Sequence, residues 1–199
     1  MPALTPPTSP GQPAWQVAEL FPPQGEWTTA DYLALETNRL VELIDGSVEV
    51  LPLPTKLHQW IVNALENRLV ALTSRSNVVS APYRFHVRPG RYREADVLYA
   101  AAVDALGEAL CEKADLVIEV VSEGLDQRHR DYVSKRDDYE AAGITEYWIV
   151  DPIDQTVTLF KRVEGRLVAT AESVTTGVVR SGTVDGFAIE VPQIFTDFS

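Results

Sequence analysis

The sequence predicts an α/β protein in which a mixed central β-sheet is flanked by helices. Three observations support this fold class. First, the expected elements follow the order helix, hairpin, helix, three strands, helix, strand. Second, apolar strand patterns at 115–122 and 146–151 lie on either side of the second long helix in the sequence. Third, three more strand patterns end the chain. At 199 residues the chain has room for one sizeable domain and a tail.

The first 25 residues predict a disordered tail before a single domain over residues 26–199. Seven of the 13 prolines lie in residues 1–23, a composition that does not form a packed core. This segment has no basic residue, as a signal peptide would, and the apolar runs fall short of the roughly 18 residues of a membrane span. The only cysteine, Cys111, suits a reducing compartment, so we expect a cytoplasmic protein with no membrane partner.

The N-terminal half of the domain predicts a capped helix, a hairpin and a long amphipathic helix. Thr28, followed three residues later by Asp31, approximates a capping box that opens a helix. Asp45-Gly46 joins two short alternating runs, which is a strong hairpin signal. From Lys56 to about Ser74, leucine and isoleucine recur at helical spacing.

The second half of the domain predicts mainly strands. Residues 77–88 and 94–100 are expected to be strands joined by a turn at Pro89-Gly90, and a short helical stretch at 103–110 precedes the apolar strand 115–122. The later elements are a helix from Asp131 to Ala142 that ends at Gly143, the strand EYWIVD, and a meander of TVTLFKRV, GRLVATAES and GFAIEV.

The net charge of −12 argues against nucleic-acid binding by the molecule as a whole, because nucleic-acid binders usually carry a basic footprint. A nucleic-acid role would need a local basic patch, or divalent cations that bridge carboxylates and phosphates. Four arginines in one run could supply phosphate-binding charge, although the run fits a solvated edge strand equally. They are Arg84, Arg88, Arg91 and Arg93.

Two acidic residues interrupt apolar strand patterns: Asp96 in EADVLYA and Glu119 in LVIEVVS. An ionised carboxylate in a buried strand is costly unless it is paired or bound to a cation. If the two strands pair, both carboxylates can hold one Mg²⁺; singly, each also fits a strand-end acid that faces solvent or an arginine. Asp115 is a poorer partner, because four residues at about 3.3 Å each separate it from Glu119 by about 13 Å.

The helix 131–142 carries Asp131, Lys135 and Tyr139 on one face, at i, i+4 and i+8. This spacing fits a surface Asp–Lys pair, and it also allows Lys135 to reach over the sheet to Glu119. We expect Tyr139 and Trp148 to pack in the core.

The segment DLVIEVVSEGLDQRHRDYVSKRDDYEAAGITEYWIVDP resembles the signature of the Uma-type putative restriction endonuclease family, within the PD-(D/E)XK nuclease superfamily. The family pattern has Pro-Asp on one strand, D-L-V-x-E-V-x-S on the next, D-x-x-x-K-x-x-x-Y on a helix, and G-x-x-E-Y-W on a further strand. The last three match through Asp115, Glu119, Ser122, Asp131, Lys135, Tyr139, Gly143, Glu146, Tyr147 and Trp148. The resemblance extends over about residues 28–162.

The resemblance implies a restriction-endonuclease-like core with additional N- and C-terminal strands, in which Asp96 and Glu119 on adjacent strands bind Mg²⁺, with Mn²⁺ as a substitute. Two positions depart from the pattern: Ala95 replaces the proline, and Val121 replaces the lysine expected two residues after the glutamate. In families of this type the lysine lies on the following helix, which makes Lys135 its counterpart.

Two more residues are candidates for the same site. Glu42, in the ELIDG hairpin, would add a carboxylate to the metal shell and fits an ordinary hairpin acid equally. His58, at the start of the long helix, would contact a phosphate or transfer a proton, and it also fits a solvated helix-end histidine. His86 and His129 are interpreted as structural.

We therefore expect a Mg²⁺-dependent endodeoxyribonuclease that hydrolyses DNA phosphodiester bonds and acts as a homodimer, because two related sites cut a duplex most simply. Asp96 and Glu119 would hold the ion, and Lys135 would stabilise the developing charge or orient water. The alternative is a catalytically silent module of the same fold that binds protein or nucleic acid. The net charge and Ala95 favour this alternative, whereas the two acids and the lysine favour the nuclease. A hydrolase of another phosphate ester is a third hypothesis.

Overall fold

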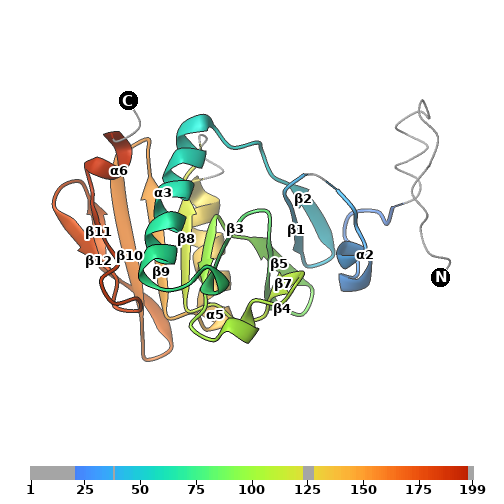
Figure 1. Ribbon diagram of the computed structural model, residues 1–199. Helices are drawn as coiled ribbons and strands as arrows, with labels where there is room; N and C mark the ends of the chain where they lie inside the picture. The colour runs from blue at the N-terminus through green and yellow to red at the C-terminus, as the bar shows by residue number, and fades with distance from the viewer. Residues whose placement is uncertain (1–20, 38, 123–127, 197–199) are drawn as a thin grey trace.

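The computed structural model describes residues 21–37, 39–122 and 128–196, which form two main β-sheets and their covering helices (Figure 1). The five-stranded sheet has the order β2 (Ser47–Val50), β1 (Val41–Ile44), β5 (Arg91–Glu94), β4 (Arg84–Arg88), β7 (Leu110–Cys111). The six-stranded sheet has the order β11 (Arg166–Val174), β10 (Thr156–Val163), β9 (Glu146–Asp151), β8 (Leu116–Val120), β6 (Val97–Tyr99), β3 (Val78–Ser80). Since β8 pairs parallel with β9 and antiparallel with β6, the predicted mixed sheet flanked by helices is confirmed.

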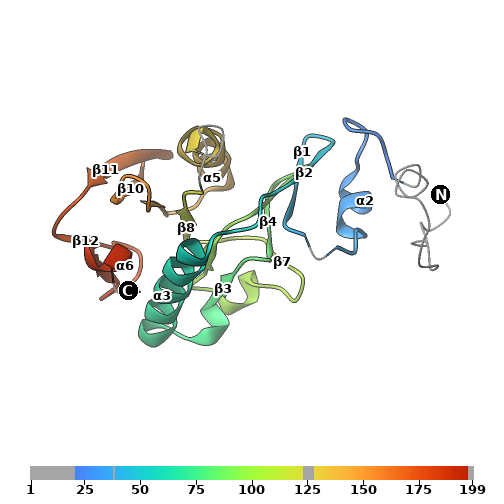
Figure 2. The same ribbon diagram turned by 90° about the horizontal axis from the view of Figure 1, so that it is seen from above.

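Two helices cover opposite faces of the six-stranded sheet, as the view in Figure 2 shows. They are α3 (Lys56–Leu72) and α5 (Arg136–Ala142), the second preceded by a π-helical segment, Arg130–Lys135. The smaller helical elements are α2 (Thr29–Leu33), α6 (Gln193–Thr196) and the 3₁₀ turns Arg75–Asn77 and Val103–Ala105.

The predicted signals at element ends are confirmed. The Thr28 hydroxyl accepts a hydrogen bond from Asp31 N at 3.2 Å, and Asp31 accepts one from Thr28 N at 3.0 Å, which completes the capping box. Asp45 and Gly46 turn the hairpin with φ of 48° and 87°, so both central residues adopt the left-handed conformation that a two-residue hairpin loop favours. Gly143 ends α5 in the same conformation, with φ of 83°.

Two predicted strands are wrong as single elements, because each divides between the two sheets. Residues 77–88 separate into β3 and β4 around Pro82, which has no N–H to donate to a ladder. Residues 94–100 separate into β5 and β6 at Ala95 and Asp96. Within residues 77–100 the chain therefore crosses between the sheets twice, and a hydrogen bond of 3.2 Å from Ala81 N to Asp96 O joins these two crossings.

Two further predictions need correction. Residues 103–110 are not a helix: a single 3₁₀ turn leads to β7, which pairs parallel with β4. The C-terminal meander ends at β11, because β13 (Ala188–Glu190) pairs with β12 (Val178–Arg180) in a separate two-stranded sheet. The apolar residues of this small sheet join the core beneath α3, which gives them a burial site outside the main ladder.

Strand β8 separates two hydrophobic layers. Leu116, Ile118 and Val120 pack in the layer beneath α3, whereas Val117 and Val121 pack in the layer beneath α5. Because side chains alternate along a strand, Glu119 shares the α5 face with these two valines. The interior location of this glutamate therefore follows from its position in the alternation.

The first 20 residues of the predicted tail lie outside the described part of the chain. Gln24 and Gly25 are described, and both contact the β1–β2 hairpin: Gln24 Oε1 accepts from Val48 N at 2.7 Å, and Gly25 N donates to Gly46 O at 2.8 Å. Within the described residues, no helix has the length and apolar character needed to cross a membrane.

Candidate active site

Asp96 and Glu119 lie opposite each other on neighbouring strands. Val97 pairs with Ile118 in the antiparallel β6–β8 ladder, and the same register one residue further places Asp96 across from Glu119. Asp96 Oδ2 accepts a hydrogen bond from Val120 N at 2.7 Å, which fixes its carboxylate against β8. Both acids line one pocket, so the predicted pairing of their strands is confirmed.

Lys135 reaches Glu119 from the helical segment above the sheet. Its Nζ donates to Glu119 Oε2 at 2.8 Å and lies 3.5 Å from Asp131 Oδ1. The interpretation of Asp131 and Lys135 as a surface pair is wrong, because they are only 3% and 2% exposed. Val121, where the superfamily lysine would stand, is an apolar member of the core beneath α5.

The π-helical geometry of Arg130–Lys135 is part of this arrangement. A π-helix replaces i→i+4 bonds by i→i+5 bonds, is rare, and occurs frequently at functional sites. Here it presents both Asp131 and Lys135 to the pocket. The sequence spacing predicted an ordinary α-helix here, because spacing alone does not distinguish an α-helix from a π-helix.

Tyr139, on α5, also contacts Glu119, as Lys135 does. Its hydroxyl donates to Glu119 Oε1, while its ring packs against Phe85 and Tyr147. The predicted core role of Tyr139 is confirmed, and the contact with Glu119 is a function that the spacing did not reveal. Trp148 also lies in the core, beside Phe187.

His58 is bound to Asp96 rather than solvated, so the interpretation as a helix-end histidine in solvent is wrong. Thr55 caps α3, and the first turn of the helix places His58 Nε2 3.1 Å from Asp96 Oδ1. Burial alone would lower the pKa of His58, but the hydrogen bond and charge of Asp96 outweigh it and raise the pKa above the ordinary value. The same pairing outweighs burial at Asp96 and lowers the pKa of its carboxyl.

Glu42 is an interior acid, not a solvent-facing hairpin residue. Its carboxylate accepts from Arg93 Nη1 at 2.6 Å and from Glu94 N at 3.2 Å, and it lies 3.9 Å from Lys135 Nζ. Burial would raise the pKa of Glu42, but Lys135 and Arg93 lower it, so the group is ionised. Glu42 does not line the pocket, and its contact with the site residues is through Lys135.

The predicted arginine run makes internal contacts on β4 and β5, and none of its members lines the pocket. Arg93 is buried between Glu42 and Asp138, and Arg91 contacts Asp138 at 2.8 Å. The other two arginines contact the N-terminal part of the domain. Arg88 pairs with Asp45, and Arg84 donates to the carbonyls of Leu33 and Leu35. Their charge is directed to internal contacts, several of which join the five-stranded sheet to α2 and α5.

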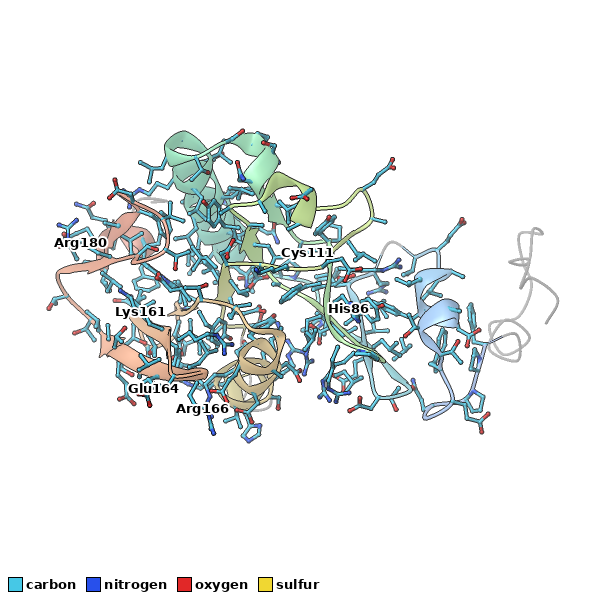
Figure 3. All side chains as sticks on the ribbon, turned by 90° about the horizontal axis from the view of Figure 1, so that it is seen from below. His86, Cys111, Lys161, Glu164, Arg166 and Arg180 are labelled. Atoms are coloured by element: carbon cyan, nitrogen blue, oxygen red, sulfur yellow. The ribbon has the colours of Figure 1, made fainter. Side chains whose placement is uncertain are left out.

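Other charged side chains lie at the far end of the molecule. Figure 3 places Lys161, Glu164, Arg166 and Arg180 around β10, β11 and β12, away from His86 and Cys111 on the five-stranded sheet. His86 pairs with Glu112 at 2.8 Å, in agreement with its structural interpretation.

The pocket is acidic in composition. Its charged lining consists of four acids, Glu94, Asp96, Glu119 and Asp131, against Arg130, Lys135 and the titratable His58. Burial raises the pKa of Glu119 against the opposing charge of Lys135, and burial also raises the pKa of Glu94 to about 7. At Lys135 the opposite holds: burial would lower the pKa, but Glu119, Asp131 and Glu42 raise it, so the ammonium stays charged.

The donor chemistry suits a hard divalent cation. Mg²⁺ is usually held by one or two carboxylates, with waters and phosphates in its remaining positions, and Asp96 and Glu119 provide two oxygen donors in one acidic pocket. No cluster of three or more protein ligands is preassembled among the described residues. Sequence reasoning missed Glu94, Arg130 and the burial of Asp131, because only the fold brings them together.

Comparison with known proteins agrees with the fold described above. The crystal structure of a putative nuclease belonging to DUF820 from Anabaena variabilis ATCC 29413 is similar in fold, with a TM-score of 0.65 and 16% identity. The match covers 85% of this chain and 97% of that chain. No curated protein sequence gave a significant match. The model of the Uma2 family, described as putative restriction endonuclease, matches residues 29–191, and the chain therefore belongs to the Uma2 family.

Proposed function

We propose that the chain is a Mg²⁺-dependent endodeoxyribonuclease that hydrolyses phosphodiester bonds in DNA, with Mn²⁺ as a substitute ion. One observation carries the proposal: Asp96 and Glu119 lie opposite each other on paired strands, and Lys135 reaches Glu119 from the next helix. Two acids and a lysine around one pocket are the groups that metal-assisted phosphodiester hydrolysis requires.

Asp96 and Glu119 would hold the ion, which when bound polarises the scissile phosphate and makes a water more acidic. His58 would hold the Asp96 carboxylate in place through its Nε2, and Tyr139 would do the same for Glu119 through its hydroxyl. Such supporting hydrogen bonds fix the orientation of ligand side chains.

Lys135 would act on the negative charge of the phosphate. Its ammonium is buried and charged, and a preorganised charge in a water-poor pocket stabilises a developing negative charge strongly. The same group could orient the attacking water through one of its three N–H donors.

The alternative is a silent nuclease-fold module. Both Glu119 oxygens accept hydrogen bonds, and the arginine run is engaged in internal contacts, two observations that favour a structural role for the cluster. A DNA substrate and a homodimer belong to the nuclease proposal, since paired sites suit duplex cleavage.

A plasmid-nicking assay in Mg²⁺ or Mn²⁺ tests the proposal with wild type, Glu119→Gln and Lys135→Met. Asp137→Asn is a matched control, because Asp137 is an exposed acid of α5 outside the pocket. We expect nicking by wild type and the control, and loss in the two site variants. Equal inactivity of all four proteins with either ion would refute the nuclease, and equal activity would identify a contaminant.

A further inference from the structure

Arg130 differs from the other cations around the site, because no carboxylate of the described residues lies within hydrogen-bond distance of it. Its side chain lines the pocket and is 17% exposed. Its nearest described carboxylate oxygen, Asp131 Oδ1, lies 3.8 Å from Nε. By contrast, Lys135 and Arg93 have carboxylate oxygens at 2.8 Å and 2.6 Å.

The Nε atom of Arg130 is buried without a hydrogen-bond partner among the described residues. A buried N–H that makes no hydrogen bond loses its hydration without compensation, and this cost is larger for a charged group. A guanidinium presents five N–H donors and no acceptor, so only an acceptor from outside this set can satisfy it.

The neighbouring acids do not fill this role. Asp131 Oδ1 lies 3.8 Å from Arg130 Nε and 3.5 Å from Lys135 Nζ, and it is itself buried without a hydrogen-bond partner among the described residues. Glu119 is engaged by Lys135 and Tyr139, and Asp96 by His58 and Val120 N. An incoming anion would supply such an acceptor, and the oxygens of a phosphate match the fork of an arginine.

We infer that Arg130 binds the non-bridging oxygens of the substrate phosphate in this pocket, in a bidentate manner. The inference rests on the proposed function. It makes Arg130 a substrate-binding residue that supplies positive charge to the pocket, since the arginines on β4 and β5 do not reach it. Since Arg130 lies on the same helical segment as Lys135, one phosphate could contact both cations from one side.

The test measures DNA binding and DNA cleavage with the same proteins: wild type, Arg130→Gln, Arg130→Lys and the control Arg136→Gln. Arg136 is the matched control because it is a more exposed arginine of α5 outside the pocket. Binding of a fluorescent duplex oligonucleotide is titrated in Ca²⁺ over a range of salt concentrations, and nicking is followed in Mg²⁺.

We expect Arg130→Gln to weaken binding and raise the KM about 10- to 100-fold, the loss of one charge-assisted contact. The slope of log affinity against log salt should fall by about 0.9, as expected for one lost phosphate contact. Arg130→Lys should keep the slope but not the full affinity, because an ammonium cannot bind a phosphate in a bidentate manner. Arg136→Gln should resemble wild type.

The outcomes separate the two proposals. If wild type binds DNA through Arg130 without nicking it, the inference stands and the nuclease proposal fails. If wild type nicks DNA and Arg130→Gln retains its affinity and salt slope, the inference is overturned and the nuclease stands. Absence of DNA binding by wild type overturns the inference directly. Should Arg130→Gln unfold, Arg130→Lys decides, because undiminished affinity in that variant contradicts a bidentate contact.

Discussion

The ammonium of Lys135 lies 2.8 Å from Glu119 Oε2, although the two residues are 16 positions apart and come from a helix and a strand. The pair compensates for two buried charges that would each be costly alone. It also brings a lysine to Glu119 from the helical segment, since the position two residues after Glu119 is the apolar Val121. The interaction therefore matters both for the stability of the buried cluster and for the proposed chemistry.

Breaking this pair should destabilise the protein. Lys135→Met leaves Glu119 buried without its cation, and we expect the free energy of unfolding to fall by about 3–5 kcal/mol. The loss should be smaller at a pH below about 8, the value to which burial raises the pKa of Glu119, because the carboxyl can then be neutral. Urea unfolding of Lys135→Met, Glu119→Gln and the double variant measures this, with a coupling of about 0.5–3 kcal/mol between the two sites. Strictly additive losses would contradict a direct interaction.

His58 should make stability depend on pH. The pKa of this histidine is higher in the folded protein than its ordinary 6.5, so folding favours the protonated form. Its contribution is fully present below pH 6.5, provided Asp96 is ionised, and is lost as the pH rises through the folded pKa. The difference in unfolding free energy between wild type and His58→Gln should shrink over that interval. A difference that does not vary with pH would exclude a charged His58–Asp96 pair.

Glu94 should make the protein less stable as the pH rises, whereas an acid paired with a cation makes it more stable. Burial raises its pKa from 4.5 to about 7, so between these values the folded state retains a proton that the unfolded state releases. Stability should therefore fall as the pH rises across this range. Glu94→Gln should remove that slope and be more stable than wild type at pH 8, by about 3 kcal/mol. Parallel stability–pH curves for the two proteins would show that Glu94 titrates normally.

Mg²⁺ should stabilise the protein through Asp96 and Glu119. A ligand at about 100 times its Kd adds about 2.7 kcal/mol to the unfolding free energy. We expect the melting temperature to rise with added Mg²⁺ in wild type and in Asp137→Asn, but not in Asp96→Asn or Glu119→Gln. Removal of the ion with EDTA should reverse the rise. An equal rise in all four proteins would place the ion elsewhere.

The sequence predicted those parts of the fold that depend on local signals. The capping box at Thr28, the turn at Asp45-Gly46 and the helix end at Gly143 are each determined by a few adjacent residues. The family resemblance added what spacing alone could not, the proximity of Lys135 to Glu119.

The errors have a common physical cause, since each depends on tertiary pairing. The chain changes sheets at Pro82 and again at Asp96, and apolar runs that continue across a sheet change have the pattern of one strand. His58 has the sequence context of a solvated residue, and only the packing of α3 brings it to Asp96. Arg130 has no recognisable motif; its importance follows from burial and from the absence of a close partner among the described residues.

The position of Asp96 at the second sheet crossing has a mechanical consequence. Its backbone carbonyl is bonded to Ala81 N at the first crossing, and its carboxylate is bonded to Val120 N and to His58. Glu119 lies within a strand that is paired on both sides, in the interior of the six-stranded sheet. The junction between the two sheets therefore holds the backbone of one of the two site acids, so a substitution at Ala81 or Pro82 is expected to disturb the pocket although neither residue lines it.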